Sequence, residues 1–190
     1  MATASPTATS RAASGVPNAV AGMLLFIAAE AMFFAGLISA YVISRAGAYA
    51  WPPAGQPRLP LAVTAINTLL LLASAATIRQ AGRDFERAAA DRPLRWTIAL
   101  GASFVLVQGL EWVRLIGYGL TMTSSSYGSF FYLLVGAHAL HVTAALFTLV
   151  WGYRLLAAAQ LRSETFQALR VFWYFVVGLW PVLYGLVYLS

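Results

Sequence analysis

Residues 17–44 read PNAVAGMLLFIAAEAMFFAGLISAYVIS, and they contain one acidic side chain, Glu30, and no basic one. A helix needs about 20 consecutive apolar residues to cross the hydrocarbon core of a bilayer. This segment exceeds that length and lacks the small-residue cleavage site expected at the end of a signal peptide. It is therefore predicted to be a membrane-spanning helix that stays in the protein.

The composition of the whole chain also indicates that the protein lies in a lipid bilayer. Of its 190 residues, 61% are hydrophobic and 9% are charged, whereas a soluble domain is about 45–50% apolar and about 25% charged. A chain this short cannot hide so much apolar surface from water. In lipid, only helices and closed barrels satisfy every backbone polar group. The apolar runs are long and unbroken, without the alternation of barrel strands, so the predicted fold is an all-α membrane bundle.

Five membrane-spanning helices are expected, and together they form one domain over residues 17–190. The tail before them, residues 1–16, is rich in Ala, Ser and Thr and is predicted to be disordered. The predicted spans are 17–44, 60–80, 95–119, 127–155 and 167–189.

The arginines predict the orientation of the bundle. All twelve basic residues are Arg. One lies in the tail, five around the loop between the second and third spans and three around the loop between the fourth and fifth, nine in all, against two in the first loop. The positive-inside rule then places the N-terminus in the cytoplasm and the C-terminus outside. No basic stripe with interleaved aromatic residues is present, so nucleic-acid binding is not expected.

Ionisable residues at membrane depth are the candidate functional residues: Glu30, Glu111, Arg114, His138 and His141. Such groups are costly in lipid and face a protein interior or a water-filled cavity. We interpret them as hydrogen-bonded structural residues, with Glu30 neutral because desolvation disfavours its charge. Glu111 and Arg114, at i and i+3, are spaced for an ion pair. A proton relay and a metal site are the alternatives.

No catalytic or metal-binding residue is assigned. The chain has no cysteine, which excludes thiolate and iron–sulfur sites. Its carboxylates and two histidines do not form the Glu-x-x-His repeat of a carboxylate metal site.

Small residues on the first span predict close helix packing. Ala31, Ala35 and Ser39 recur every four residues, beside Gly36. Ladders of this kind let two helix backbones approach closely in lipid.

Five segments resemble, in the same order, landmarks of one family, subunit III of the haem–copper oxidases, in its short five-helix bacterial form. They are Leu25–Gly36 with Glu30 before Phe33-Phe34, Trp51-Pro52-Pro53 followed by Ile66–Leu72, Gln108 with Glu111-Trp112, Tyr127-Gly128-Ser129 followed by Gly136–Val142, and Trp173, Phe175 and Trp180. The chain departs from the family pattern at Ala29, Arg114, Tyr174 and Val177.

The resemblance implies a non-catalytic subunit of a respiratory terminal oxidase in the bacterial inner membrane. Such a subunit binds no haem or copper itself, since these belong to the catalytic subunit I that it packs against. It holds phospholipids in a cleft and supports turnover and proton uptake. Glu30, Glu111, His138 and His141 would then be structural or lipid-cleft residues. The alternatives are an accessory protein of nitric oxide reductase and a stand-alone proton or ion transporter.

Overall fold

The computed structural model describes residues 16–189 and contains five long helices in that range. They are α1 (Asn18–Ala46), α2 (Leu61–Asp84), α3 (Asp91–Gly117), α4 (Ser126–Ala157) and α5 (Ser163–Tyr188). All five are long and apolar enough to cross a membrane, which confirms the predicted all-α class and the number of spans. The predicted tail lies, apart from Val16, outside the described residues.

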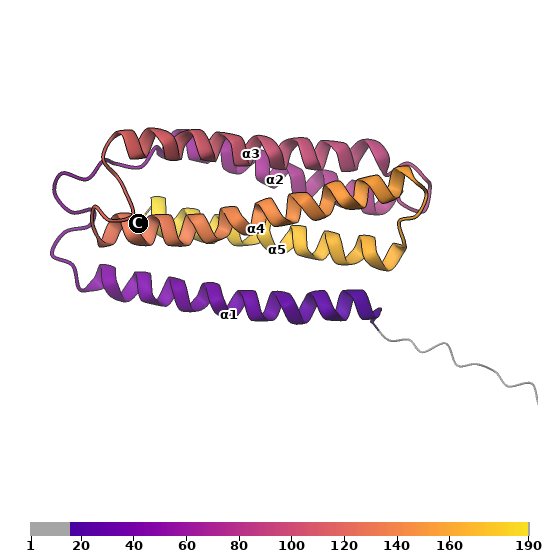
Figure 1. The fold of residues 1–190 in the computed structure, drawn as a ribbon, viewed down its shortest axis with the longest axis horizontal. Helices are drawn as coiled ribbons and strands as arrows, with labels where there is room; N and C mark the ends of the chain where they lie inside the picture. The colour runs from indigo at the N-terminus through magenta and orange to yellow at the C-terminus, as the bar shows by residue number, and fades with distance from the viewer. Residues whose placement is uncertain (1–15, 190) are drawn as a thin grey trace, which may run out of the picture.

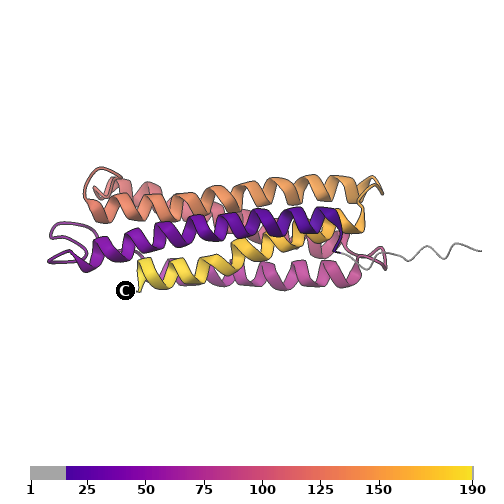
Figure 2. The same cartoon turned by 90° about the horizontal axis from the view of Figure 1, so that it is seen from below.

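The helices run alongside one another in three layers (Figure 1). The α2–α3 hairpin forms one layer, α4 and α5 form the middle layer, and α1 lies on the far side of that pair (Figures 1 and 2). The α1 backbone comes close to α4 and α5 but not to α2 or α3, all four being fully described. The first helix is therefore an edge helix, and the other four surround the core.

At the arginine-rich end, three helices extend about one turn beyond the predicted spans. The α2 helix continues to Asp84, α3 begins at Asp91 and α5 begins at Ser163. These turns are polar, and Arg95 Nη2 pairs with Asp91 Oδ2 at 2.9 Å. A carboxylate in the first turn of a helix also stabilises the helix dipole. Hydropathy locates the part of a helix in lipid, whereas hydrogen bonding and local ion pairs decide where the helix ends.

Two buried tryptophans of α5 fix the core. Trp173 and Trp180 are fully buried. Their indole nitrogens donate to Ser74 Oγ at 3.1 Å and to Thr68 Oγ1 at 2.8 Å, both on α2. Trp173 approaches α3 at Gly101, where an added Cβ would lie 2.5 Å from the indole ring. The packing of α5 on α2 thus depends on two indole–hydroxyl hydrogen bonds, and its packing on α3 depends on the space left by Gly101.

The loop between α1 and α2 folds back onto the end of the bundle opposite the arginine-rich end. The Trp51 ring makes edge contacts with Tyr41 of α1 and Tyr127 of α4, with centroids 5.7 and 5.4 Å away. Tyr41 also donates its hydroxyl hydrogen to the Leu186 carbonyl of α5 at 2.9 Å. This aromatic cluster ties the edge helix to the middle layer at that end.

Candidate functional site

Glu30 and His141, which the sequence places on different spans, meet between α1 and α4. Glu30 Oε2 and His141 Nε2 lie 2.8 Å apart, and both side chains are largely covered, with 21% and 14% of their surface exposed. The rings of Phe33 and Phe34 flank the imidazole. The pair is polar, shielded on one side by aromatic rings, and positioned by two helices.

The other nitrogen of His141 sets the proton arrangement. His141 Nδ1 lies 2.7 Å from the Ala137 carbonyl oxygen. Because a carbonyl oxygen only accepts, Nδ1 carries a hydrogen. One further proton then lies between Nε2 and the Glu30 carboxyl, held by either group. In both forms the pair has no net charge, which is the inexpensive state at membrane depth.

His138 has a different environment, although it is only one turn away. Positions i and i+3 are about 60° apart around a helix, and here that rotation separates the two imidazoles. His138 is fully buried, stacks on Trp180 at a centroid distance of 5.0 Å, and meets the edge of Phe104. Neither of its ring nitrogens has a hydrogen-bond partner among the described residues. His138 is thus a core residue of the α3–α4–α5 interface.

Asn67 and Gln108, two further polar residues of the spans, also find partners across helices. Asn67 Nδ2 of α2 donates to the Phe104 carbonyl of α3 at 3.1 Å. Gln108 Nε2 of α3 donates to the Tyr188 hydroxyl of α5 at 3.0 Å. Each bond joins two helices in the low-dielectric interior, where an unmade hydrogen bond is expensive. Sequence reasoning missed Tyr188, which carries no signal beyond its place near the chain end.

Glu111 and Arg114 form a local ion pair. Arg114 Nη1 donates to Glu111 Oε1 at 2.6 Å. The carboxylate side is buried, with 7% of its side chain exposed, whereas the arginine is 64% exposed. Arg114 therefore neutralises a buried carboxylate from the surface of α3.

These groups do not form a continuous proton path. Within residues 16–189, no hydrogen bond joins the Glu30–His141 pair to His138 or to Glu111. In the same range, no three His, Asp or Glu side chains gather closely enough to hold a metal ion. The arrangement is local: Glu30 pairs with His141 across two helices, Glu111 pairs with Arg114 within one turn, and His138, within the described residues, is held by ring stacking alone.

The small-residue ladder of α1 faces away from the other helices of this chain. Ala31, Ala35, Gly36 and Ser39 are all exposed, and a Cβ added at Gly36 would meet nothing within 4 Å. Only Phe34 and Tyr41 of α1 are fully buried. The first helix thus uses its aromatic positions to pack on α4 and α5 and presents its small residues outward.

The five long apolar helices in the described part of the chain define a multi-pass, all-α membrane protein. A model of the cytochrome c oxidase subunit III family matches residues 5–190. The probable cytochrome c oxidase subunit 3 of Mycobacterium leprae (strain TN) is 38% identical over 183 residues, covering 90% of this chain and 88% of the relative. The cytochrome c oxidase subunit 3 of Synechocystis is 34% identical, covering 88% and 74%.

The same named subunit of Corynebacterium diphtheriae is 35% identical over 187 residues, covering 93% of this chain and 91% of the relative. The chain belongs to the cytochrome c oxidase subunit III family. As a member, it is a subunit of an oxidase complex with other subunits.

Proposed function

We propose that this chain is the non-catalytic subunit III of a bacterial respiratory oxidase, that it stabilises the catalytic subunit and that it holds phospholipid. The complex reduces oxygen and pumps protons with haem and copper carried by the catalytic subunit. The N-terminus lies in the cytoplasm and the C-terminus outside. In this assignment Glu30, Glu111, His138 and His141 are structural or lipid-cleft residues.

The outward face of α1 is the observation that carries the assembly role. Most residues of this helix are apolar, yet its own chain buries only two of its residues. Lipid could cover such a surface, but a ladder of small residues is the feature that helix–helix contacts in membranes use. A transmembrane helix of the catalytic subunit is the proposed occupant of the face made by Ala31, Ala35, Gly36 and Ser39.

A pull-down from native membranes in mild detergent tests this function. Haem absorbance, a large co-purifying subunit and oxygen consumption are expected. The replacement Gly36→Leu should reduce the amount of co-purifying subunit, because the larger side chain would keep a partner helix at a greater distance. It would not disturb the chain's own core, since an added Cβ meets nothing within 4 Å. The matched control is Gly109→Leu on α3, where an added Cβ also meets nothing within 4 Å. A colourless preparation of this chain alone would contradict the proposal and favour a stand-alone transporter.

A further inference from the structure

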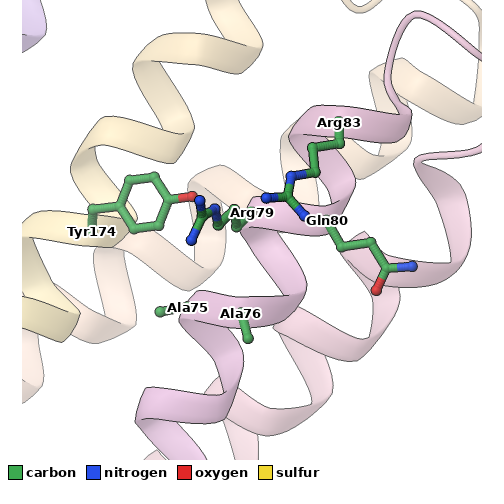
Figure 3. Close-up of a pocket in the computed structure, with 6 residues that line it drawn as sticks. All are labelled: Ala75, Ala76, Arg79, Gln80, Arg83 and Tyr174. Carbon is green, nitrogen blue, oxygen red and sulfur yellow. The ribbon is translucent and has the colours of Figure 1, made fainter.

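A groove with a strongly basic rim lies at the arginine-rich end of the bundle, between α2 and α5 (Figure 3). It has a volume of about 600 Å³ and is open to the surroundings. Figure 3 shows Arg79 and Arg83 extending their guanidinium groups toward the same region, with the hydroxyl of Tyr174 pointing at Arg79. The lining residues are Ala75, Ala76, Arg79, Gln80, Arg83 and Tyr174.

The cations of this groove have no acidic partner in the described part of the chain. Four arginines, Arg87, Arg95, Arg114 and Arg162, each lie within 4.0 Å of a carboxylate. No carboxylate between residues 16 and 189 comes that close to Arg79 or Arg83. The nearby acid Asp84 is directed to Arg87 instead, at 3.9 Å. The groove therefore has uncompensated positive charge.

A third arginine without an acidic partner among the described residues lies on α5, against the same end of α2. Arg170 lies one turn before Tyr174 and packs its guanidinium against Gly82 of α2. It also lies over the Phe166 ring, 5.8 Å from the centroid. Arg170 likewise has no carboxylate within 4.0 Å among residues 16–189. Because Gly82 leaves room for it, the cation lies between the two helices rather than out in solvent.

The position of the groove along the membrane span indicates which kind of ligand it can bind. Arg79 and Arg83 lie in the last two turns of α2, at the polar end of a membrane span, while Ala75 and Ala76 lie one turn deeper. Charged residues at the end of a span are expected at the level of the lipid head groups. Guanidinium forks match the geometry of a phosphate group, and basic pockets between helices at this level suit anionic lipids.

Exposed apolar and small residues follow the groove along both helices, toward the middle of each span. On α5, Gly178 and Pro181 follow Tyr174 at i+4 and i+7, so they share its face, and both are exposed. A Cβ added at Gly178 would meet nothing within 4 Å. On α2, Leu72 lies on the same face as Arg79 and is 43% exposed. The α1 backbone does not come close to α2, so these three exposed residues are available to an acyl chain.

We propose that this groove binds an anionic phospholipid, with the phosphate held by Arg79, Arg83 and Tyr174 and an acyl chain lying over Gly178, Pro181 and Leu72. The inference deepens the lipid-holding role proposed above, which it rests on, by assigning a site and a head-group charge. A second basic groove is lined by Arg92, Arg95, Trp96 and Ala99. It does not offer two unpaired arginines to a phosphate, because Arg95 is already paired with Asp91.

The test compares two matched double variants of the full chain, purified in its complex. Each is incubated with mixed vesicles of phosphatidylglycerol and phosphatidylcholine and repurified, and the bound lipid is measured by native mass spectrometry. In Arg79→Gln/Arg83→Gln, phosphatidylglycerol should bind about 25-fold more weakly, from two interfacial cations at about 1 kcal/mol each. In Arg92→Gln/Arg95→Gln, which removes the same charge at the same end, binding should stay at the wild-type value.

A third variant, Gly178→Leu, tests the acyl path while leaving all arginines in place, and it should also lower phosphatidylglycerol binding. Equal lipid binding in wild type and Arg79→Gln/Arg83→Gln would overturn the proposal, as would an equal loss in the Arg92→Gln/Arg95→Gln control. Displacement of the lipid by inorganic phosphate alone, or occupation of the groove by an acidic side chain of another subunit, would also overturn it. If the lipid stays bound but no haem-containing subunit co-purifies, the oxidase assignment fails and the lipid site stands.

Discussion

The Glu30 carboxyl of α1 and the His141 imidazole of α4 lie 2.8 Å apart, although 111 positions separate them in the chain. This is the one side-chain hydrogen bond that joins α1 to α4 within the described residues. With the Tyr41 hydroxyl bonded to the Leu186 carbonyl, it fixes the rotation of a helix that is apolar on all sides.

We expect Glu30→Gln to preserve the complex, because the amide group of Gln can donate to His141 Nε2 in place of the carboxyl. Glu30→Leu should lower stability by about 1–3 kcal/mol, the cost of leaving a buried polar group unpaired. Thermal unfolding of the purified complex and the yield of the catalytic subunit measure both effects. Met32→Leu, at an exposed position of the same helix, is the control. If Glu30→Gln dissociates the complex as Glu30→Leu does, the interpretation of Glu30 and His141 as a proton-sharing pair is wrong.

Two glycines of α3 should respond differently to replacement by alanine. At Gly101 a Cβ would lie 2.5 Å from the Trp173 ring and 2.9 Å from Leu146, and Trp173 is held by its bond to Ser74. Overpacking of this kind costs about 1–3 kcal/mol. At Gly109 nothing lies within 4 Å, and alanine gains helix propensity. Gly101→Ala should therefore lower the unfolding temperature and Gly109→Ala should not; a lowered value for both would contradict the packing.

Trp180→Phe tests the link between α5 and α2. The change removes the bond from Trp180 Nε1 to Thr68 Oγ1 and shrinks the ring that stacks on His138. The lost hydrogen bond alone should cost about 1 kcal/mol, with a further loss from the smaller ring. Trp96→Phe, at a position that is 55% exposed, should change the unfolding temperature little. Equal effects in the two variants would show that the buried bond contributes nothing.

The pairing of Glu111 with Arg114 calls for a double-mutant cycle. Arg114→Leu leaves a buried carboxylate without its cation, so it should destabilise more than Glu111→Gln does. The double variant Glu111→Gln/Arg114→Leu should recover part of that loss, giving a coupling energy of about 1 kcal/mol. Additive effects in thermal unfolding would mean that the two side chains do not stabilise each other.

The absence of cysteine from the sequence permits a clean test of orientation. Ala54→Cys lies in the loop after α1, and Ala89→Cys lies in the loop between α2 and α3; both positions are exposed. With the N-terminus in the cytoplasm, a maleimide that cannot cross membranes should label Ala54→Cys in intact spheroplasts, and label Ala89→Cys only after lysis. The reverse pattern would invert the proposed topology.

Several features could be predicted from the sequence because they depend on local order. Apolar runs longer than the hydrocarbon core predicted the five spans, whose number is confirmed. Five segments that resemble landmarks of the family, in the same order, pointed to the family that the comparisons then showed. The i, i+3 spacing of Glu111 and Arg114 needs no knowledge of other helices, since one turn of α3 brings the two side chains together.

Only the tertiary structure decided which helix faces meet. A helix that is apolar all round, such as α1, carries no hydropathy signal for its rotation, so the sequence could not tell that Phe34 points inward and Ala35 outward. The same holds for His138 and His141, whose partners lie on α5 and α1, and for Tyr188, which receives the Gln108 bond. In lipid, the rotation and pairing of helices follow from side-chain fit and interhelical hydrogen bonds, and these exist only once the bundle has assembled.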